Sequence, residues 1–421
     1  MFFPLNALLR EKFIKNNMLM NSMIKDIKVY HIYDSRGTGT IECDIVTDKC
    51  TIVSMAPSGA STGKTERKVL PAKGIGEAIT KFKKEIAPKM IKWEIGNQRS
   101  FDEFLHEVDG TNDFSGIGTA LSTSLSIAYA KYSAYVQEIP LYKYIADLAG
   151  TTIKMPYLMG NVMNGGKHAI GGPDIQEYLS LSMGKNIRES IEANFTVHKH
   201  IAEILKKKGM KAIGKGDEGG WVVSLGNVEA LEILHTACSE VREEYGYNVY
   251  PALDFAASQI YSNGLYKYKE QSLDLEGQIG FVSNIVDKYG LLSVEDPIDE
   301  GDFEGFAKLT NKIGNKALVI GDDLYTTDTK RLEKGIALGS TNAVLVKVNQ
   351  IGTLTDTVEF VKQSVRYKYK NVVSHRSGET CDPSIAHISV GLGSYALKTG
   401  VMGGERVSKL NELIKIEEDM G

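Results

Sequence analysis

The sequence is poor in cysteine, in long apolar runs and in net charge, and each shortage excludes a class of protein. The four cysteines among 421 residues show no C-x-x-C spacing, so the pattern of a zinc knuckle or dithiol pair is absent. No apolar run approaches the roughly 20 residues of a transmembrane helix. A net charge of -4 gives no reason to expect nucleic acid or an anionic membrane as partner. We therefore expect a soluble, cytoplasmic protein with reduced thiols.

The length and patterning of the chain predict two folded domains. A hydrophobic content of 42% and a charged content of 24% are those of an ordinary globular protein. Residues 1–22 precede the first clear strand pattern, so we expect them to be a flexible extension without a role in the chemistry. We place an N-terminal α+β domain at 23–150 and a second domain at 151–421.

The N-terminal domain begins with strands and continues with helices. Three short runs rich in Ile, Val and Tyr, at 24–34, 40–48 and 50–56, predict an antiparallel meander. Helical periodicity follows at 75–91, 100–108 and 120–136. Strands followed by helices indicate an α+β fold that caps the rest of the chain.

The second domain shows short apolar strands that alternate with helical segments, which indicates parallel β/α units. A polar residue follows or ends each of five strands, and these residues are separated by about one β/α unit or slightly more. If the strands close into a TIM-like β/α barrel, all five side chains meet at its C-terminal rim, where such barrels carry their active sites. The five residues are Asp254, Glu295, Asp322, Lys347 and His375.

Three of these residues would bring carboxylates together without cysteine or histidine. Asp254, Glu295 and Asp322 offer hard oxygen ligands, which favour Mg²⁺ over zinc or copper. A single acid at the end of a strand is often only a solvated loop residue, but three at successive strand ends indicate a site. The pattern therefore predicts a magnesium centre on the rim.

Two further features indicate acid-base chemistry on an anionic substrate. Lys347 lies in the apolar run AVLVKVNQ, where a charge is unfavourable without a purpose. Beside Mg²⁺ and partly desolvated, its pKa would fall from about 10.4, and a neutral amine can act as a general base. In the run 374–380, Arg376 offers a planar fork suited to a phosphate or carboxylate dianion.

The run SGASTGKT at 58–65 nearly matches a P-loop, but the spacing is one residue short and Pro71 soon interrupts any helix. A mobile lid with hydroxyl side chains fits this run better.

Taken in order, the motifs resemble those of the enolase family over nearly the whole chain from Met23 onward. Each motif alone is weak, but their order and spacing together are specific. The matching segments are YDSRG (33–37), SGASTG (58–63), NGGKH (164–168), DIQE (174–177), GDEGG (216–220), ALD (252–254), SVEDP (293–297), GDDL (321–324), LVKVNQIGT (345–353), SHRSGET (374–380) and LKTG (397–400).

The resemblance implies a lyase that reversibly dehydrates 2-phosphoglycerate to phosphoenolpyruvate with two Mg²⁺ ions. In that scheme Lys347 abstracts the C2 proton, and Glu218, supported by Glu177, protonates the departing 3-hydroxyl. The metal ligands that the resemblance implies are Asp254, Glu295 and Asp322 for the first ion and Ser61 for the second. The residues that it places around the substrate are His168, Gln176, Glu177, Glu295, Asp322, His375, Arg376, Ser377 and Lys398.

Three other functions stay open at this point. A racemase or cycloisomerase of the same superfamily would share the three carboxylates but lack the phosphate apparatus. An aldolase that forms a Schiff base on Lys347 would need no magnesium, and a third possibility is a binding protein without catalysis. The family resemblance also implies a homodimer or a higher homo-oligomer, in which Glu42 with Lys415 or Arg406 is a candidate subunit contact, and a surface or secreted pool beside the cytoplasmic one.

Overall fold

An antiparallel sheet of three strands begins the fold. The computed structural model describes residues 23–60, 62–93, 97–210 and 214–421, so the predicted extension at 1–22 lies outside the described residues. The strands pair in the order β1-β2-β3, which confirms the predicted meander. Their bounds are β1 (Asp26–Tyr33), β2 (Gly39–Val46) and β3 (Thr51–Met55).

Helices cover one side of this sheet and enclose a small apolar core. Alternate residues of β2, namely Ile41, Cys43 and Ile45, are fully buried, as the period of two in a half-covered strand requires. They pack in one cluster with residues of the helix α5, which contacts β2 and β3. The helices of this part are α2 (Ile75–Lys81), the π-helical turn η1 (Phe82–Ile86), α3 (Ala87–Met90), α4 (Gln98–Asp109), α5 (Thr119–Val136) and α6 (Leu141–Ala149).

Eight strands close into a barrel, as predicted from the sequence, and the pairing of β16 with β4 completes the ring. Around the ring, the pairings from β8 through β12, β13, β14, β15 and β16 to β4 are all parallel, but β5 runs antiparallel to both β4 and β8. The barrel strands are β4 (Tyr157–Asn164), β5 (Glu177–Ser182), β8 (Val249–Asp254), β12 (Ser293–Glu295), β13 (Leu318–Gly321), β14 (Ala343–Val346), β15 (Lys370–Ser374) and β16 (Ala396–Gly400).

The antiparallel strand was not anticipated from the sequence. The loop between β4 and β5 holds only a short 3-10 turn and no crossover helix, and parallel neighbours need such a crossover. Because β5 is reversed, its first residue rather than its last lies at the rim. Glu177 is paired there with Asp254, the last residue of β8.

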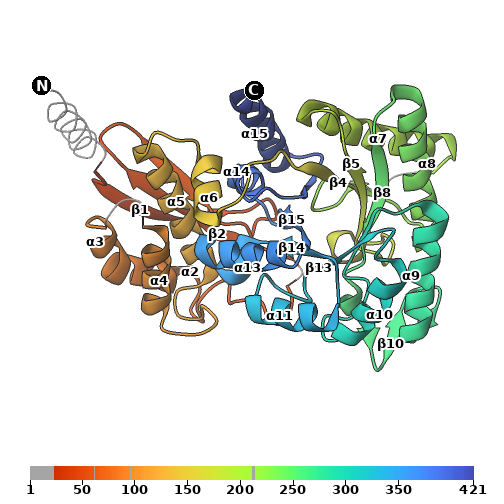
Figure 1. Cartoon of the computed structure of the whole chain (residues 1–421), viewed down its shortest axis with the longest axis horizontal. Coiled ribbons are helices and arrows are strands. Elements are labelled where there is room, and N and C mark those ends of the chain that lie inside the picture. The colour runs from red at the N-terminus through yellow and green to blue at the C-terminus, as the bar shows by residue number, and fades with distance from the viewer. Residues whose placement is uncertain (1–22, 61, 94–96, 211–213) are drawn as a thin grey trace, which may run out of the picture.

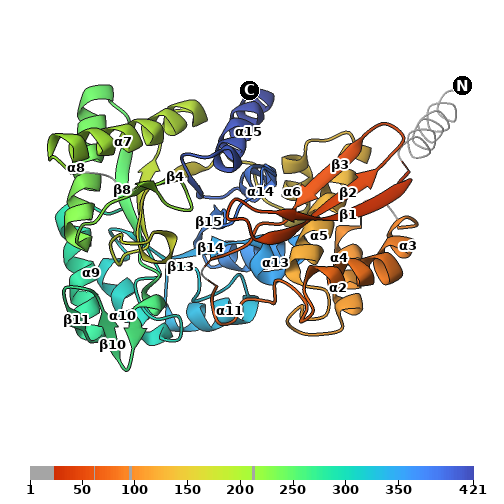
Figure 2. The same ribbon diagram turned by 180° about the vertical axis from the view of Figure 1, so that it is seen from behind.

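Helices surround the barrel, and Figures 1 and 2 show the small sheet and its helices beside one end of it. The larger apolar cluster lies between the strands and these helices. The longer helices are α7 (Ile187–Lys207), α8 (Asn227–Tyr245), α9 (Leu275–Tyr289), α10 (Phe303–Ile313), α11 (Thr329–Leu338), α13 (Leu354–Arg366), α14 (Ser384–Gly391) and α15 (Gly404–Met420). The short elements are η2 (Gly166–His168), β6 (Gly214–Lys215), β7 (Trp221–Val222), η3 (Ala257–Gln259), β9 (Tyr261–Ser262), β10 (Leu265–Lys267), β11 (Ser272–Leu273) and α12 (Val348–Ile351).

A separate apolar layer fills the inside of the barrel. Its members come from alternate positions of the strands and are almost completely buried, so the barrel is a packed core and not a pore. The layer comprises Met159, Leu179, Leu181, Ala252, Ile320, Ala343, Leu345, Val372 and Ala396. None of the helices in the described ranges is long and apolar enough to cross a membrane.

The small domain touches the barrel close to the rim. Ser58 forms a β-bridge with Gly378, and the lysine side chain of Lys131 pairs with Asp382 at 2.8 Å. Within α5, the hydroxyl of Ser122 donates to the carbonyl of Gly352 at 2.8 Å. Buried hydroxyls of a mostly buried helix thus find backbone acceptors in the barrel. The bridge at Ser58 places this part of the small domain beside the segment that follows β15.

Candidate active site

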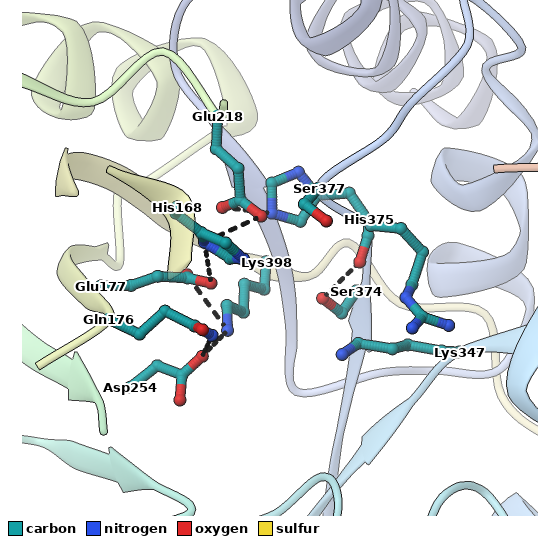
Figure 3. A pocket seen from close by; sticks show the side chains of 11 residues that line it. His168, Gln176, Glu177, Glu218, Asp254, Lys347, Ser374, His375, Ser377 and Lys398 are labelled. Atoms are coloured by element: carbon teal, nitrogen blue, oxygen red, sulfur yellow. Dashed lines mark hydrogen bonds and ion pairs between the residues drawn. The ribbon is translucent and has the colours of Figure 1, made fainter. Parts of the chain in front are cut away.

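A cavity lies at the C-terminal end of the barrel, where the predicted residues converge (Figure 3). Each side chain comes from a strand end or from the loop that follows it. Along each barrel strand, side chains alternate between the inside and the outside of the barrel. The inward residue that follows the apolar layer is therefore two positions further along the strand, at the level of the cavity. The cavity is lined by His168, Gln176, Glu177, Glu218, Asp254, Lys347, Ser374, His375, Arg376, Ser377 and Lys398.

Lys398 of β16 is the charged centre of the cavity. Its Nζ lies 2.9 Å from Asp254 Oδ2, 2.8 Å from Glu295 Oε1 and 3.1 Å from Glu177 Oε2. Burial alone would lower the pKa of Lys398, but the three carboxylates hold it well above its usual value. In the same cluster, burial and the charge of Asp254 raise the pKa of Glu295 well above its usual value. One ammonium group therefore balances three buried acids only in part.

Lys347 stands on the other side of the cavity. Strand β14 ends at Val346, so Lys347 lies just after the strand and not within it, and its Nζ is 2.5 Å from Asp322 Oδ2. Burial lowers the pKa of Lys347, but Asp322 and Glu295 outweigh burial, so the pKa is raised. The expectation of a lowered pKa concerned a lysine beside Mg²⁺ and stays a prediction. In the arrangement seen here, Asp322 is paired directly with the amine and stabilises its charged form.

Two carboxylates and two imidazoles face Lys347 from across the cavity (Figure 3). Glu218 Oε2 lies 3.0 Å from His375 Nε2 and accepts a hydrogen bond of 2.8 Å from Asn161 Nδ2. His168 Nδ1 lies 3.4 Å from Glu177 Oε1 and 3.6 Å from Glu218 Oε1. The two carboxylates and the two imidazoles are all buried, so charges on them interact strongly.

The two carboxyl groups of this set, Glu177 and Glu218, differ in the direction of their pKa shifts. Burial and the neighbouring charge of Glu218 raise the pKa of Glu177 well above its usual value. Burial would also raise the pKa of Glu218, but His375, His168 and Arg406 hold it well below its usual value. A pair whose pKa values are separated in this way is the usual sign of divided acid and base roles.

A guanidinium and a hydroxyl lie near the amine of Lys347. Arg376 is fully enclosed, and its two terminal nitrogens lie 2.9–3.1 Å from the carboxylate of Glu66 on the loop 58–70. The hydroxyl of Ser377 accepts a hydrogen bond of 2.6 Å from the backbone N–H of Ala60. The guanidinium and this hydroxyl thus contact Glu66 and Ala60 of the small domain, and the predicted binding of a dianion by Arg376 stays a prediction.

The acids of the rim have the donor chemistry of a hard metal ion. Carboxylate oxygens predominate, and the raised pKa of Glu295 marks negative charge that the ammonium of Lys398 leaves unbalanced. Within the described ranges, two groups of donors lie within 4.8 Å of one another, namely His168 with Glu177 and Glu218, and Asp296 with Asp322 and Asp323. The predicted set Asp254, Glu295 and Asp322 is divided between the two lysines, and its oxygen atoms do not form such a group.

Nearly all residues predicted for the site lie together in the structure. Ser61, the predicted ligand of a second ion, lies outside the described residues. The sequence reasoning missed Asn161, Glu66 and Asp296. Asn161 lies two residues beyond Met159 of the apolar layer, so a period of two along β4 would have indicated it. Asp296 receives backbone N–H groups from residues 322 and 323, and its left-handed φ of 39° has no signal in the sequence.

Arg406 was named as a candidate subunit contact, and the structure excludes that role. Its side chain is 0% exposed, so it cannot reach a partner chain. Lys415, the other candidate, is 72% exposed. Arg406 lies behind His375 instead, on the side away from the cavity.

The fold and the site together define a class, the β/α barrels that carry buried acids and lysines at the C-terminal rim. Two family models match the chain: "Enolase, C-terminal TIM barrel domain" over residues 152–421, and "Enolase, N-terminal domain" over residues 24–145. The enolase of Methanothermobacter thermautotrophicus is 45% identical over 408 residues, which is 95% of this chain and 98% of the relative. That of Picrophilus torridus is 43% identical over 95% of this chain and 100% of the relative. The chain belongs to the enolase family, and this membership implies a divalent metal.

Proposed function

We propose that this chain reversibly dehydrates 2-phosphoglycerate to phosphoenolpyruvate with Mg²⁺ as its metal. The observation that carries the proposal is one cavity with a lysine amine and a guanidinium on one side and two carboxyl groups of displaced pKa on the other. An elimination needs a base at one carbon and an acid at the next, and it needs anchors for the anionic ends of the substrate.

Lys347 is the proposed base. It removes the C2 proton, and the electron pair passes into the substrate carboxylate. To accept this proton the amine must be neutral, and its pairing with Asp322 favours the charged form. A cation held by Asp322 would weaken this pairing. The proposed ligands of one ion are Asp254, Glu295 and Asp322, and Ser61 is a proposed ligand of a second. When bound, the metal stabilises the negative charge that develops on the substrate carboxylate.

Glu177 and Glu218 together are the proposed acid. The bond from C3 to its oxygen breaks as the electron pair forms the C2–C3 double bond, and the departing hydroxide takes a proton to leave as water. Because the pKa of Glu177 is raised and that of Glu218 is lowered, Glu177 is the group of the two that holds a proton more readily. The two groups lie within 4.8 Å of each other, so either can reach the same leaving group. Delivery by Glu218 then requires that the proton pass to it first.

The remaining residues of the cavity are the proposed substrate anchors. Lys398 binds the substrate carboxylate together with the metal, and Arg376 and Ser377 bind the phosphate. His168, Gln176 and His375 line the pocket. We further propose a cytoplasmic location, domain limits at 23–150 and 151–421, and a homo-oligomer, in which the exposed Lys415 is a candidate contact.

The test is direct. The purified chain with 2-phosphoglycerate and Mg²⁺ should form phosphoenolpyruvate, which is followed by the ultraviolet absorbance of its double bond, and a chelator should abolish the rate reversibly. Absence of turnover with Mg²⁺ would refute the proposal. Borohydride trapping serves as the control for an aldolase, because a covalent adduct on Lys347 would favour Schiff-base chemistry instead.

A further inference from the structure

Arg406 binds the back of the active site without reaching the cavity. Its side chain is 0% exposed and is not among the residues that line the cavity. Its Nη1 donates to His375 Nδ1 at 2.8 Å and to the carbonyl of Arg376 at 2.5 Å. Its Nη2 donates to the carbonyl of Ser377 at 2.7 Å and to that of Asp217 at 3.1 Å. One guanidinium thus joins the segments that carry His375 and Glu218.

The donors around His375 decide which nitrogen carries its proton. Nδ1 faces the guanidinium of Arg406 at 2.8 Å and the backbone N–H of Gly400 at 3.2 Å, and both groups can only donate. A proton on Nδ1 would point at two other N–H groups. In the neutral imidazole the proton must therefore be on Nε2, which lies 3.0 Å from Glu218 Oε2.

The imidazole is neutral at ordinary pH. Burial lowers the pKa of His375 to about 4, and the nearby charge of Arg406 acts in the same direction, while Glu218 opposes both. The charged groups that face His375 are Glu218, Arg406 and the more distant Glu379. The neutral form with the proton on Nε2 is thus the one that meets Glu218.

We propose that Arg406 is a positioning residue, which fixes His375 in the tautomer that presents its Nε2–H to Glu218. The guanidinium donates to Nδ1 and so reserves Nε2 for the carboxylate that we assign to proton delivery. The consequence for catalysis rests on the proposed function, whereas the tautomer is a property of the protein alone and can be measured without substrate.

The chain offers a matched control on the same helix. Lys409 is also 0% exposed and lies one turn further along α15. Its Nζ is 2.9 Å from Glu379 Oε2 and also donates to the carbonyl of Thr380. Replacement of Lys409 by Met removes a buried cation from the same helix but leaves the donors of His375 Nδ1 in place.

The first measurement is the ¹⁵N NMR spectrum of the full chain labelled in its histidines, with His375 assigned by the loss of its signals in a His375→Asn variant. We expect the shifts of a neutral ring protonated at Nε2 near pH 7. A proton on Nδ1 overturns the proposal, whatever the enzyme does.

The second measurement compares Arg406→Met, Arg406→Lys and Lys409→Met. Loss of a group that orients a residue of the active site typically lowers activity about 10–100-fold, and we expect this fall in kcat for Arg406→Met. We also expect a mixed His375 tautomer and an acid limb of the kcat profile moved upward by about one pH unit, because a cation beside the imidazole is gone. Arg406→Lys should recover part of the kcat and part of the shift in the pH profile, since it retains the charge.

Lys409→Met should lose thermal stability but keep the tautomer, the pH profile and kcat. If Lys409→Met loses kcat as far as Arg406→Met does, packing of α15 explains the effect and the proposal fails. It fails equally if Arg406→Met keeps the wild-type tautomer. If Arg406→Met does not fold, the wild-type spectrum and the tautomer and kcat of Arg406→Lys still test the proposal. A wild-type chain that turns over no 2-phosphoglycerate would refute the proposed function alone.

Discussion

The apolar layer inside the barrel and the charged rim above it are built by the same strands, often only two residues apart. Leu345 is fully buried in the layer, and Lys347, the next inward position, carries a charge beside Asp322. The same step leads from Ala252 to Asp254. The lower level is formed mainly by apolar side chains, and the rim concentrates polar side chains that are also largely buried.

This difference separates the residues that stabilise the fold from those that we assign to the reaction. Apolar side chains in the layer lose nothing on burial, whereas each rim charge loses its hydration and needs a partner of opposite sign. The partners are internal at present, Lys398 for Glu295 and Lys347 for Asp322. The buried charges of the rim therefore contribute little to the stability of the fold. They produce a strong electric field, which can stabilise a bound anion and its metal.

The largest effect should follow from substitution at the rim. Lys347→Met retains the length of the side chain but removes the proposed base, and we expect kcat/KM for 2-phosphoglycerate to fall about 10²–10⁴-fold. Steady-state kinetics with Mg²⁺ would measure the fall, and near-ultraviolet circular dichroism would show whether the fold is retained. A correctly folded variant with wild-type activity would contradict the assignment of Lys347.

One level lower on the same strand, the effect should be on stability. Leu345→Ala leaves a cavity in the layer, and we expect the free energy of unfolding to fall by about 2–5 kcal/mol. Denaturant unfolding would measure this loss, and kcat per folded molecule should stay within about threefold of wild type, since the rim contacts are untouched. A loss of kcat as large as that of the Lys347 variant would remove the distinction between the two levels.

The two levels also differ in how far the sequence predicts them. The strands of the layer are short apolar runs, and the polar residue at or just after each run identified the rim position of Asp254, Glu295, Asp322 and His375. That reasoning needs only the period of two and the parallel direction of the strands. It fails for β5, whose reversed direction brings its first residue, Glu177, to the rim. Glu177 was assigned by the family motif alone.

Charge states could not be predicted in the same way, because they depend on distances between segments remote in sequence. The pKa of Lys347 depends on Asp322, whose carboxylate lies 2.5 Å away across neighbouring strands. The roles of Glu66 and Arg406 likewise depend on contacts with the segment 375–377. The spacing of polar residues in the sequence indicates which of them lie on the rim. Which of these residues form ion pairs or hydrogen bonds with one another follows only from the folded structure.

The pH dependence of stability should reveal the buried imidazoles of the rim and its surroundings. Burial lowers the pKa of both His375 and His198 from 6.5 to about 4. Between pH 6.5 and 4 the unfolded chain therefore binds more protons than the folded one. The stabilising contribution is complete above pH 6.5 and decreases as the pH falls toward 4, by up to about 3 kcal/mol for each imidazole.

Denaturant unfolding at a series of pH values would measure this slope. His198 stacks on Trp221 outside the cavity, so His198→Phe should make the slope shallower while kcat/KM near pH 7 changes little. An unchanged slope in this variant would show that His198 is not buried in its neutral form.

The smallest effect should come from an ion pair on the surface, although its geometry matches that of the rim. Lys316 Nζ lies 2.6 Å from Asp287 Oδ1, close to the 2.5 Å between Lys347 and Asp322, but both of its side chains are 53% exposed. Water and salt screen such a pair, so Lys316→Ala should change the free energy of unfolding by less than about 0.5 kcal/mol and leave kcat unchanged. A loss of more than about 1 kcal/mol at physiological salt would show that length, and not burial, determines the strength of ion pairs in this protein.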